Sequence, residues 1–127
     1  MASTDEFLSG EVFAVAGASN DRSKFGNRVL RHYLAHGKRA IPVHPTETEV
    51  EGLAVARTLA NLPEPVWGLS IITPPRVTER LVEEAAAAGI ERIWMQPGAE
   101  SPAAIARARE LGLEVIAGGP CVLVELR

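Results

Sequence analysis

The sequence has few of the features that mark secreted, membrane-bound or nucleic-acid-binding proteins. A single cysteine rules out an internal disulfide and favours a reducing, cytoplasmic setting. No apolar run approaches the roughly 20 residues that cross a bilayer, and the polar, acidic segment Met1–Gly10 does not resemble a signal peptide. With 13 basic and 16 acidic residues, the net charge of −3 has the wrong sign for binding a phosphate backbone. We therefore expect a cytoplasmic protein with neither nucleic acid nor a membrane as partner.

The composition is that of one small globular unit. At 127 residues and 46% apolar, the chain is of ordinary domain size and can fill a core. We expect a single domain over 1–127, with 1–10 as a flexible or helical extension. The sequence leaves the oligomeric state open, and a homo-oligomer is possible.

Strands and helices are expected to alternate along the chain. Continuous apolar segments are typical of strands covered on both faces, and apolar stripes at helical spacing are typical of surface helices. The predicted strands are 11–17, 40–44, 67–73, 92–95 and 113–117, with a short strand near 53–56. The predicted helices are 24–36 (N-cap Ser23), 76–88 and 101–111 (N-cap Ser101), with a helical turn near 59–62 and an edge strand or tail over 121–126. This order predicts a Rossmann-like, doubly wound three-layer α/β domain whose mostly parallel sheet has about five strands.

The loop after the first predicted strand has the composition of a phosphate-binding turn. Small residues let backbone N–H groups approach an anion, and the N-terminus of the following helix favours negative charge. The loop and first helical turn supply these candidate ligand contacts: Gly17, Ala18, Ser19, Asn20, Arg22, Lys24, Phe25 and Gly26. An ordinary turn that needs glycine only for its geometry is the alternative.

Two familiar nucleotide sites are disfavoured. The loop lacks the full G-x-G-x-x-G pattern, and the second strand ends in Val43-His44-Pro45 without an acidic residue for the ribose of NAD. The sequence also lacks G-x-x-x-x-G-K-[ST], which excludes a P-loop NTPase.

Several short motifs occur in an order that resembles a known family. They are Val15-Ala16-Gly17-Ala18-Ser19-Asn20, Phe25-Gly26, Pro42-Val43-His44-Pro45, Gly52, Ile72-Thr73-Pro74-Pro75, Trp94-Met95-Gln96-Pro97-Gly98 and Cys121. The chain resembles the small stand-alone CoA-binding proteins of bacteria and archaea, which are similar to the N-terminal domain of the succinyl-CoA synthetase α subunit. It departs from them at His44, where the family carries asparagine, and at Gly119-Pro120, where the family carries Asp-Arg.

The resemblance implies a site for coenzyme A or an acyl-CoA, a small nucleotide ligand. The loop from Gly17 to Gly26 would hold the diphosphate. His44 and Pro45 would border the adenosine, with His44 or Arg22 near the 3′-phosphate. Thr73, Pro74 and Pro75 would form a rigid wall, and Gln96 and Gly98 would lie along the pantetheine arm, with Trp94 as either a further wall or core.

The sequence shows no acid–base pair and no nucleophile with a partner base, so non-catalytic binding is the preferred interpretation. His32 and His36 share a helix face without a third ligand, so we expect a solvated face and no metal site. Two alternatives stay open: an NAD(P)-type or other nucleotide-binding component of an oxidoreductase or transferase, and a regulatory subunit that uses the fold for protein interaction.

Overall fold

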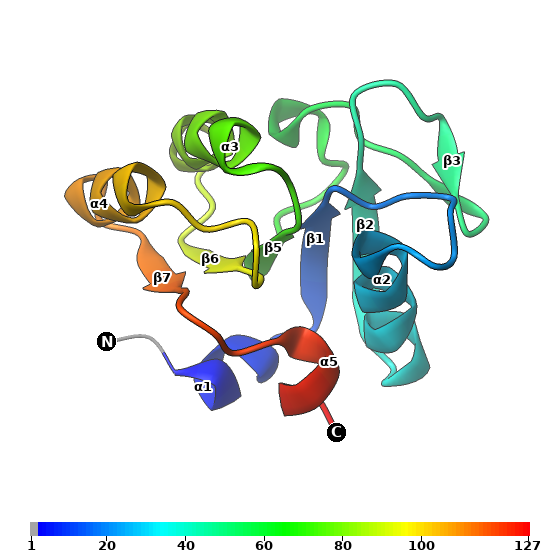
Figure 1. Cartoon of the computed structure of the whole chain (residues 1–127). Helices are drawn as coiled ribbons and strands as arrows, with labels where there is room; N and C mark the ends of the chain where they lie inside the picture. The colour runs from blue at the N-terminus through cyan, green and yellow to red at the C-terminus, as the bar shows by residue number, and fades with distance from the viewer. Residues whose placement is uncertain (1–2) are drawn as a thin grey trace.

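The computed structural model, which describes residues 3–127, has a central sheet with helices on both faces (Figure 1). The helices are α1 (Thr4–Leu8), α2 (Phe25–Ala35), α3 (Pro75–Ala87), α4 (Pro102–Glu110) and α5 (Val122–Glu125), with one 3₁₀ turn, η1 (Leu59–Asn61). The strands are β1 (Val12–Ala16), β2 (Arg39–Val43), β3 (Glu49–Val50), β4 (Leu53–Ala54), β5 (Gly68–Ile71), β6 (Arg92–Met95) and β7 (Glu114–Ile116).

The main sheet is parallel throughout and confirms the predicted fold class. Its strand order is β2-β1-β5-β6-β7, and every neighbouring pair is parallel. In the sheet register, Ala16 lies beside both Val43 and Ile71, so β1, β2 and β5 end at one edge. The strands β3 and β4 form a separate antiparallel hairpin.

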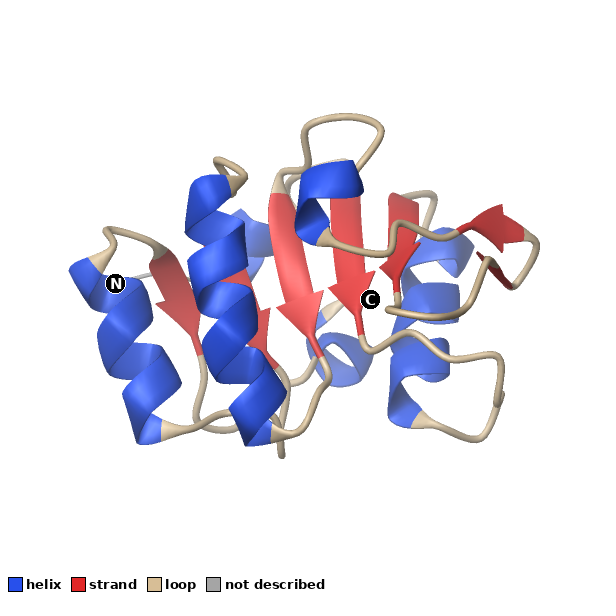
Figure 2. Ribbon diagram, turned by 90° about the horizontal axis from the view of Figure 1, so that it is seen from above, coloured by secondary structure: helices blue, strands red, loops and turns tan. Residues whose placement is uncertain are grey.

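The strand order creates a switch point between β1 and β5. The chain leaves β1 through α2 on one face of the sheet and leaves β5 through α3 on the other, as Figures 1 and 2 show. In doubly wound sheets, ligands bind outside the carboxyl ends of the strands at this point. The fold therefore directs attention to the segments that follow β1, β2 and β5.

Two apolar clusters hold the layers together. One lies under α3 and α4, and the other lies under α1, α2 and α5 on the opposite face of the sheet. The second cluster is aromatic at its centre, where the Phe13 ring stacks on Tyr33 with centroids 4.6 Å apart and on Phe7 at 5.4 Å.

The predicted elements agree with the structure to within one or two residues at their ends, except at three places, the first of which is the short strand β3, which was not predicted. The N-cap of α2 is Lys24, so Ser23 was wrong as the cap, because Ser23 is bonded instead to Asp21 within the loop. The C-terminal segment was expected as an edge strand or tail and is the helix α5, since its chain folds back over α2 and buries Val122 and Leu126.

The buried tyrosine makes the stability of the fold sensitive to alkali. The Tyr33 hydroxyl is 2.7 Å from Ser70 Oγ, and burial raises the pKa of Tyr33 above its usual value. The folded protein thus holds this proton more tightly than the unfolded chain, so its contribution to stability is complete below about pH 10 and is lost as the pH rises further.

We expect the free energy of unfolding to fall above about pH 10. Since Tyr33 is the chain's single tyrosine, the ultraviolet absorbance of tyrosinate reports its ionisation directly. Urea unfolding between pH 7 and 11 measures the effect. In Tyr33→Phe, which leaves Ser70 unpaired at a cost of about 1–3 kcal/mol, the alkaline loss should be smaller. An equally steep loss in this variant would contradict the assignment.

Candidate functional site

Gly17 shapes the exit of β1 and tolerates no side chain. Its φ is +92°, and a Cβ atom there would lie 1.9 Å from the carbonyl oxygen of Ile72. The Gly17 N–H donates to the Val43 carbonyl at 3.2 Å, while Ile72 N–H donates to the Ala16 carbonyl at 2.8 Å. The loop therefore begins in close backbone contact with both neighbouring strands, at the switch point.

Gly26 brings the start of α2 against this same loop. A Cβ atom at Gly26 would lie 2.0 Å from the carbonyl oxygen of Gly17. Close packing of this kind between helix and strand is the role of the last glycine in dinucleotide-binding turns. The two glycines thus place the N-terminus of α2 directly at the exit of β1.

The N-terminus of α2 offers free hydrogen-bond donors. Lys24, at the N-cap, makes no side-chain cap bond, and no partner within residues 3–127 accepts from the N–H groups of Phe25, Gly26 and Asn27. The helix dipole adds positive potential at the same place. Within the loop, hydrogen bonds from the Ser23 hydroxyl and N–H lower the pKa of Asp21.

Asn20 and Arg22 hold the β3–β4 hairpin against the loop. Asn20 Nδ2 donates to Glu47 Oε2 at 3.0 Å and to the Glu49 carbonyl at 2.8 Å, and Arg22 Nε is 3.3 Å from Glu51 Oε2. Both side chains, expected to face a ligand, are therefore engaged with the hairpin.

Sequence reasoning missed Asn27, which ties the loop together. Its side chain is fully buried; Nδ2 donates to the Ser19 carbonyl at 2.7 Å and to Glu51 Oε2 at 3.0 Å. The signal was a polar residue on the apolar stripe of α2, between Gly26 and Val29.

His44 lies at the carboxyl end of β2, where it caps the following turn. Its Nδ1 accepts from the N–H groups of Thr46 at 3.1 Å and Glu47 at 3.0 Å. Accepting through Nδ1 places the proton of the neutral ring on Nε2. Within residues 3–127, His44 Nε2 has no hydrogen-bond partner, which leaves one donor beside Pro45.

A pocket of about 220 Å³ lies on the α3 side of the switch point. Three expected site residues, Gly17, Pro45 and Thr73, line it together with two residues that sequence reasoning missed, Arg57 and Arg80. The Thr73 hydroxyl is fixed by Thr78 Oγ1 at 2.8 Å, and Pro74 and Pro75 begin α3 as its N-cap and first residue.

The loops after β6 and β7 stand apart from this pocket. Glu100 accepts from the N–H groups of Gly98 at 2.9 Å and Gly118 at 3.4 Å, so an internal carboxylate already occupies these donors. Gln96 is fully buried, and its Oε1 accepts from Val122 N–H at 3.0 Å. Trp94 is core, with its Nε1 donating to the Pro120 carbonyl at 3.0 Å.

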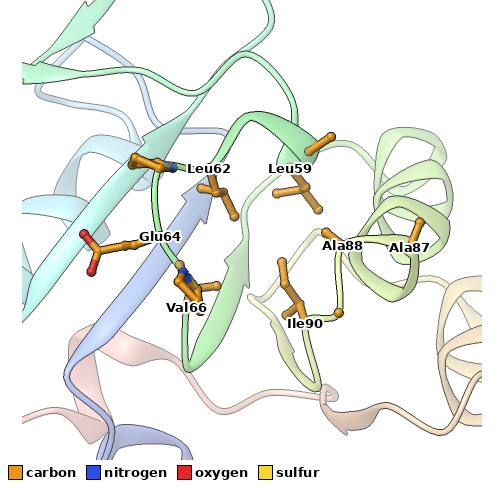
Figure 3. A pocket seen from close by; sticks show the side chains of 11 residues that line it. Leu59, Leu62, Glu64, Val66, Ala87, Ala88 and Ile90 are labelled. Carbon is orange, nitrogen blue, oxygen red and sulfur yellow. The ribbon is translucent and has the colours of Figure 1, made fainter.

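A larger pocket of about 500 Å³ lies away from the switch point (Figure 3). It is bordered by the segment from Leu59 to Val66, before β5, and by the end of α3 with the residues that follow it, 87–90. These segments meet at the amino edge of the sheet, where parallel folds do not place their ligands.

The two histidines of α2 differ from each other. His36 is exposed as expected, whereas His32 is half buried because its Nε2 is 2.7 Å from the Leu126 carbonyl after α5. Within residues 3–127, no group of three or more His, Cys, Asp or Glu side chains is arranged to hold a metal ion, and no helix is long and apolar enough to cross a membrane.

The topology places the chain among the doubly wound α/β domains, a class in which ligands typically bind at the carboxyl edge of the sheet. The chain belongs to the CoA-binding domain family, whose model matches residues 11–127.

Known proteins similar to this chain include stand-alone domains and parts of larger enzymes. A conserved hypothetical protein from Pyrococcus furiosus is 36% identical with a TM-score of 0.86, covering 91% of this chain and 98% of that one. The α subunit of an ADP-forming acetate–CoA ligase II from the same species is 28% identical over 90 residues. The matched segment is 70% of this chain and 20% of that subunit. A dinucleotide-forming acetyl-coenzyme A synthetase 1 from Ca. Korarchaeum cryptofilum is 26% identical with a TM-score of 0.75, covering 84% of this chain and 25% of that one.

Proposed function

We propose that this protein binds coenzyme A or an acyl-CoA without catalysing a reaction on it, and that the diphosphate lies at the loop from Gly17 to Gly26. The observation that carries the proposal is the unpartnered N-terminus of α2, placed against the exit of β1 by two glycines with no room for a side chain. Membership of the CoA-binding domain family supplies the chemical class of the ligand.

The residues present fit such a ligand. The N–H groups of Phe25, Gly26 and Asn27 supply donors for phosphate oxygens, and Lys24 adds a cation beside them. Farther along the same sheet edge, after β6 and β7, the N–H groups of Gly98 and Gly118 already donate to Glu100. The diphosphate is therefore assigned to the α2 side, where the donors are free.

The side-chain roles are divided among the remaining residues. His44 offers its Nε2 proton and Pro45 an apolar face for the adenosine, while Thr73, Pro74 and Pro75 form the wall at the start of α3. Gln96 and Gly98 are proposed to lie near the pantetheine arm. Because the Gln96 side chain is buried, we propose that it shapes this part of the site and does not touch the ligand. Asn20 and Arg22 support the loop through the hairpin.

The experiment that tests the proposal is thermal unfolding with CoA, acetyl-CoA, NAD⁺, NADPH and ATP in parallel. A ligand that binds the folded state stabilises it by about 2.7 kcal/mol at a hundredfold excess over its dissociation constant. We expect a rise in midpoint with CoA and acetyl-CoA. Since Ser19→Glu places a carboxylate beside the free amides, the rise should disappear in this variant.

Ala106→Glu, at an exposed position of α4, adds the same charge elsewhere and should keep the rise. A larger rise with NADPH than with CoA would favour the oxidoreductase or transferase alternative. If no nucleotide raises the midpoint, the regulatory alternative becomes the better account of the fold.

A further inference from the structure

The pocket on the α3 side of the switch point lies next to the loop from Gly17 to Gly26, and charged residues outside that loop line it. Gly17 belongs to both, because it ends β1 and also lines the pocket. Arg57 enters from the segment that follows the bridge between Val43 and Ala56, and Arg80 enters from α3. Two arginines from separate elements therefore line one cavity beside the start of the loop.

Among the residues that the structure describes, neither arginine has an ion-pair partner. Within residues 3–127, no acidic side chain forms an ion pair with Arg57 or Arg80, whereas Arg22, Arg39 and Arg107 are each paired with a glutamate. Cations left unpaired in a concave site attract an anionic group, and the planar guanidinium suits the oxygens of a phosphate.

One acidic side chain, Glu84, also lines the pocket. It lies four residues after Arg80 on α3, and it reduces the positive charge of the lining without cancelling it, since the lining holds two arginines and one glutamate. A phosphate monoester, which carries nearly two negative charges at neutral pH, gains more from this lining than a neutral hydroxyl does.

We propose that Arg57 and Arg80 form a second anion subsite that takes a phosphate monoester on the ligand's ribose, separate from the α2 amides that take the diphosphate. The inference rests on the proposed function, because CoA carries such a group as its 3′-phosphate. It assigns the 3′-phosphate to Arg57 and Arg80 in place of Arg22, because the Arg22 guanidinium is already paired with Glu51. The subsite makes the protein select CoA over otherwise identical nucleotides that lack this phosphate.

The test compares CoA with 3′-dephospho-CoA by isothermal titration calorimetry. Because a hydrogen bond to a charged group contributes about 1.5–3 kcal/mol, the intact protein should bind CoA at least about tenfold more tightly than 3′-dephospho-CoA. Arg57→Gln and Arg80→Gln should each remove most of this preference and leave the affinity for 3′-dephospho-CoA unchanged. Both residues are exposed, and binding of 3′-dephospho-CoA reports that each variant is folded.

Two further variants sharpen the result. Glu84→Gln should raise the affinity for CoA and not that for 3′-dephospho-CoA, because it removes the opposing charge from the lining. Arg109→Gln, an exposed arginine of α4, changes the net charge equally and should leave the preference intact.

The outcomes separate the inference from the proposed function. If both nucleotides bind equally, or if the preference survives in both arginine variants, CoA binding stands and the second subsite is overturned. If neither nucleotide binds, the proposed function fails and the subsite fails with it.

Discussion

Replacing Gly26 with alanine is expected to destabilise the protein and to abolish CoA binding. In an exposed helical position the same change would stabilise by about 1 kcal/mol, because alanine is the better helix former. Here the new Cβ would lie 2.0 Å from the Gly17 carbonyl oxygen, 2.8 Å from its carbon and 3.3 Å from Ala18 Cα. All three are backbone atoms, so no side chain can rotate away, and α2 itself must move off the loop.

The cost should reach about 3 kcal/mol, the upper part of the usual range for overpacking. Urea unfolding measures it, and the thermal shift with CoA measures the loss of the site. Ala35→Gly, at an exposed position of α2, is the matched control. This variant should lose no more than about 1 kcal/mol of stability and keep the thermal shift with CoA. Full stability in Gly26→Ala would show that the helix does not need this contact.

Phe7→Ala should remove much of the stability of the fold, although Phe7 lies outside the segment that the family model matches. The Phe7 side chain is 2% exposed, stacks on Phe13 and meets Trp94 edge-on with centroids 5.3 Å apart. Its carbonyl accepts from Trp67 Nε1 at 2.9 Å. Truncation would leave a cavity in the aromatic cluster, at a cost of about 3–5 kcal/mol.

Because domains have only about 5–15 kcal/mol of stability in total, this loss should be plain in urea unfolding. Asp5→Ala alters an exposed residue of the same helix and should cost no more than about 1 kcal/mol. The variant Phe7→Ala should still respond to CoA where it is folded, since α1 precedes the amino end of β1, away from the loop. A loss below about 1 kcal/mol would make α1 an appendage rather than part of the core.

The main elements could be predicted because their signals are local. A continuous apolar segment predicted β1, the apolar stripe of α2 predicted its helix, and Ser101-Pro102 predicted the start of α4, where Ser101 Oγ accepts from Ala104 N–H at 3.0 Å. The C-terminal helix was missed because a short apolar segment such as Val122–Glu125 has no periodicity of its own. It is stabilised by burial against α2 and by Gln96.

The sequence alone determined the doubly wound fold, the glycine-rich exit of β1 and the resemblance to CoA-binding proteins. These depend on residue order within single elements, where apolar periodicity and turn residues act directly. Only the tertiary structure decided which cations are free: Arg22 is engaged by Glu51 across the hairpin, whereas Arg57 and Arg80, 23 positions apart in the sequence, line one pocket without ion-pair partners among residues 3–127. Charge pairing depends on distances in space between side chains of different elements, and no local pattern in the chain records those distances.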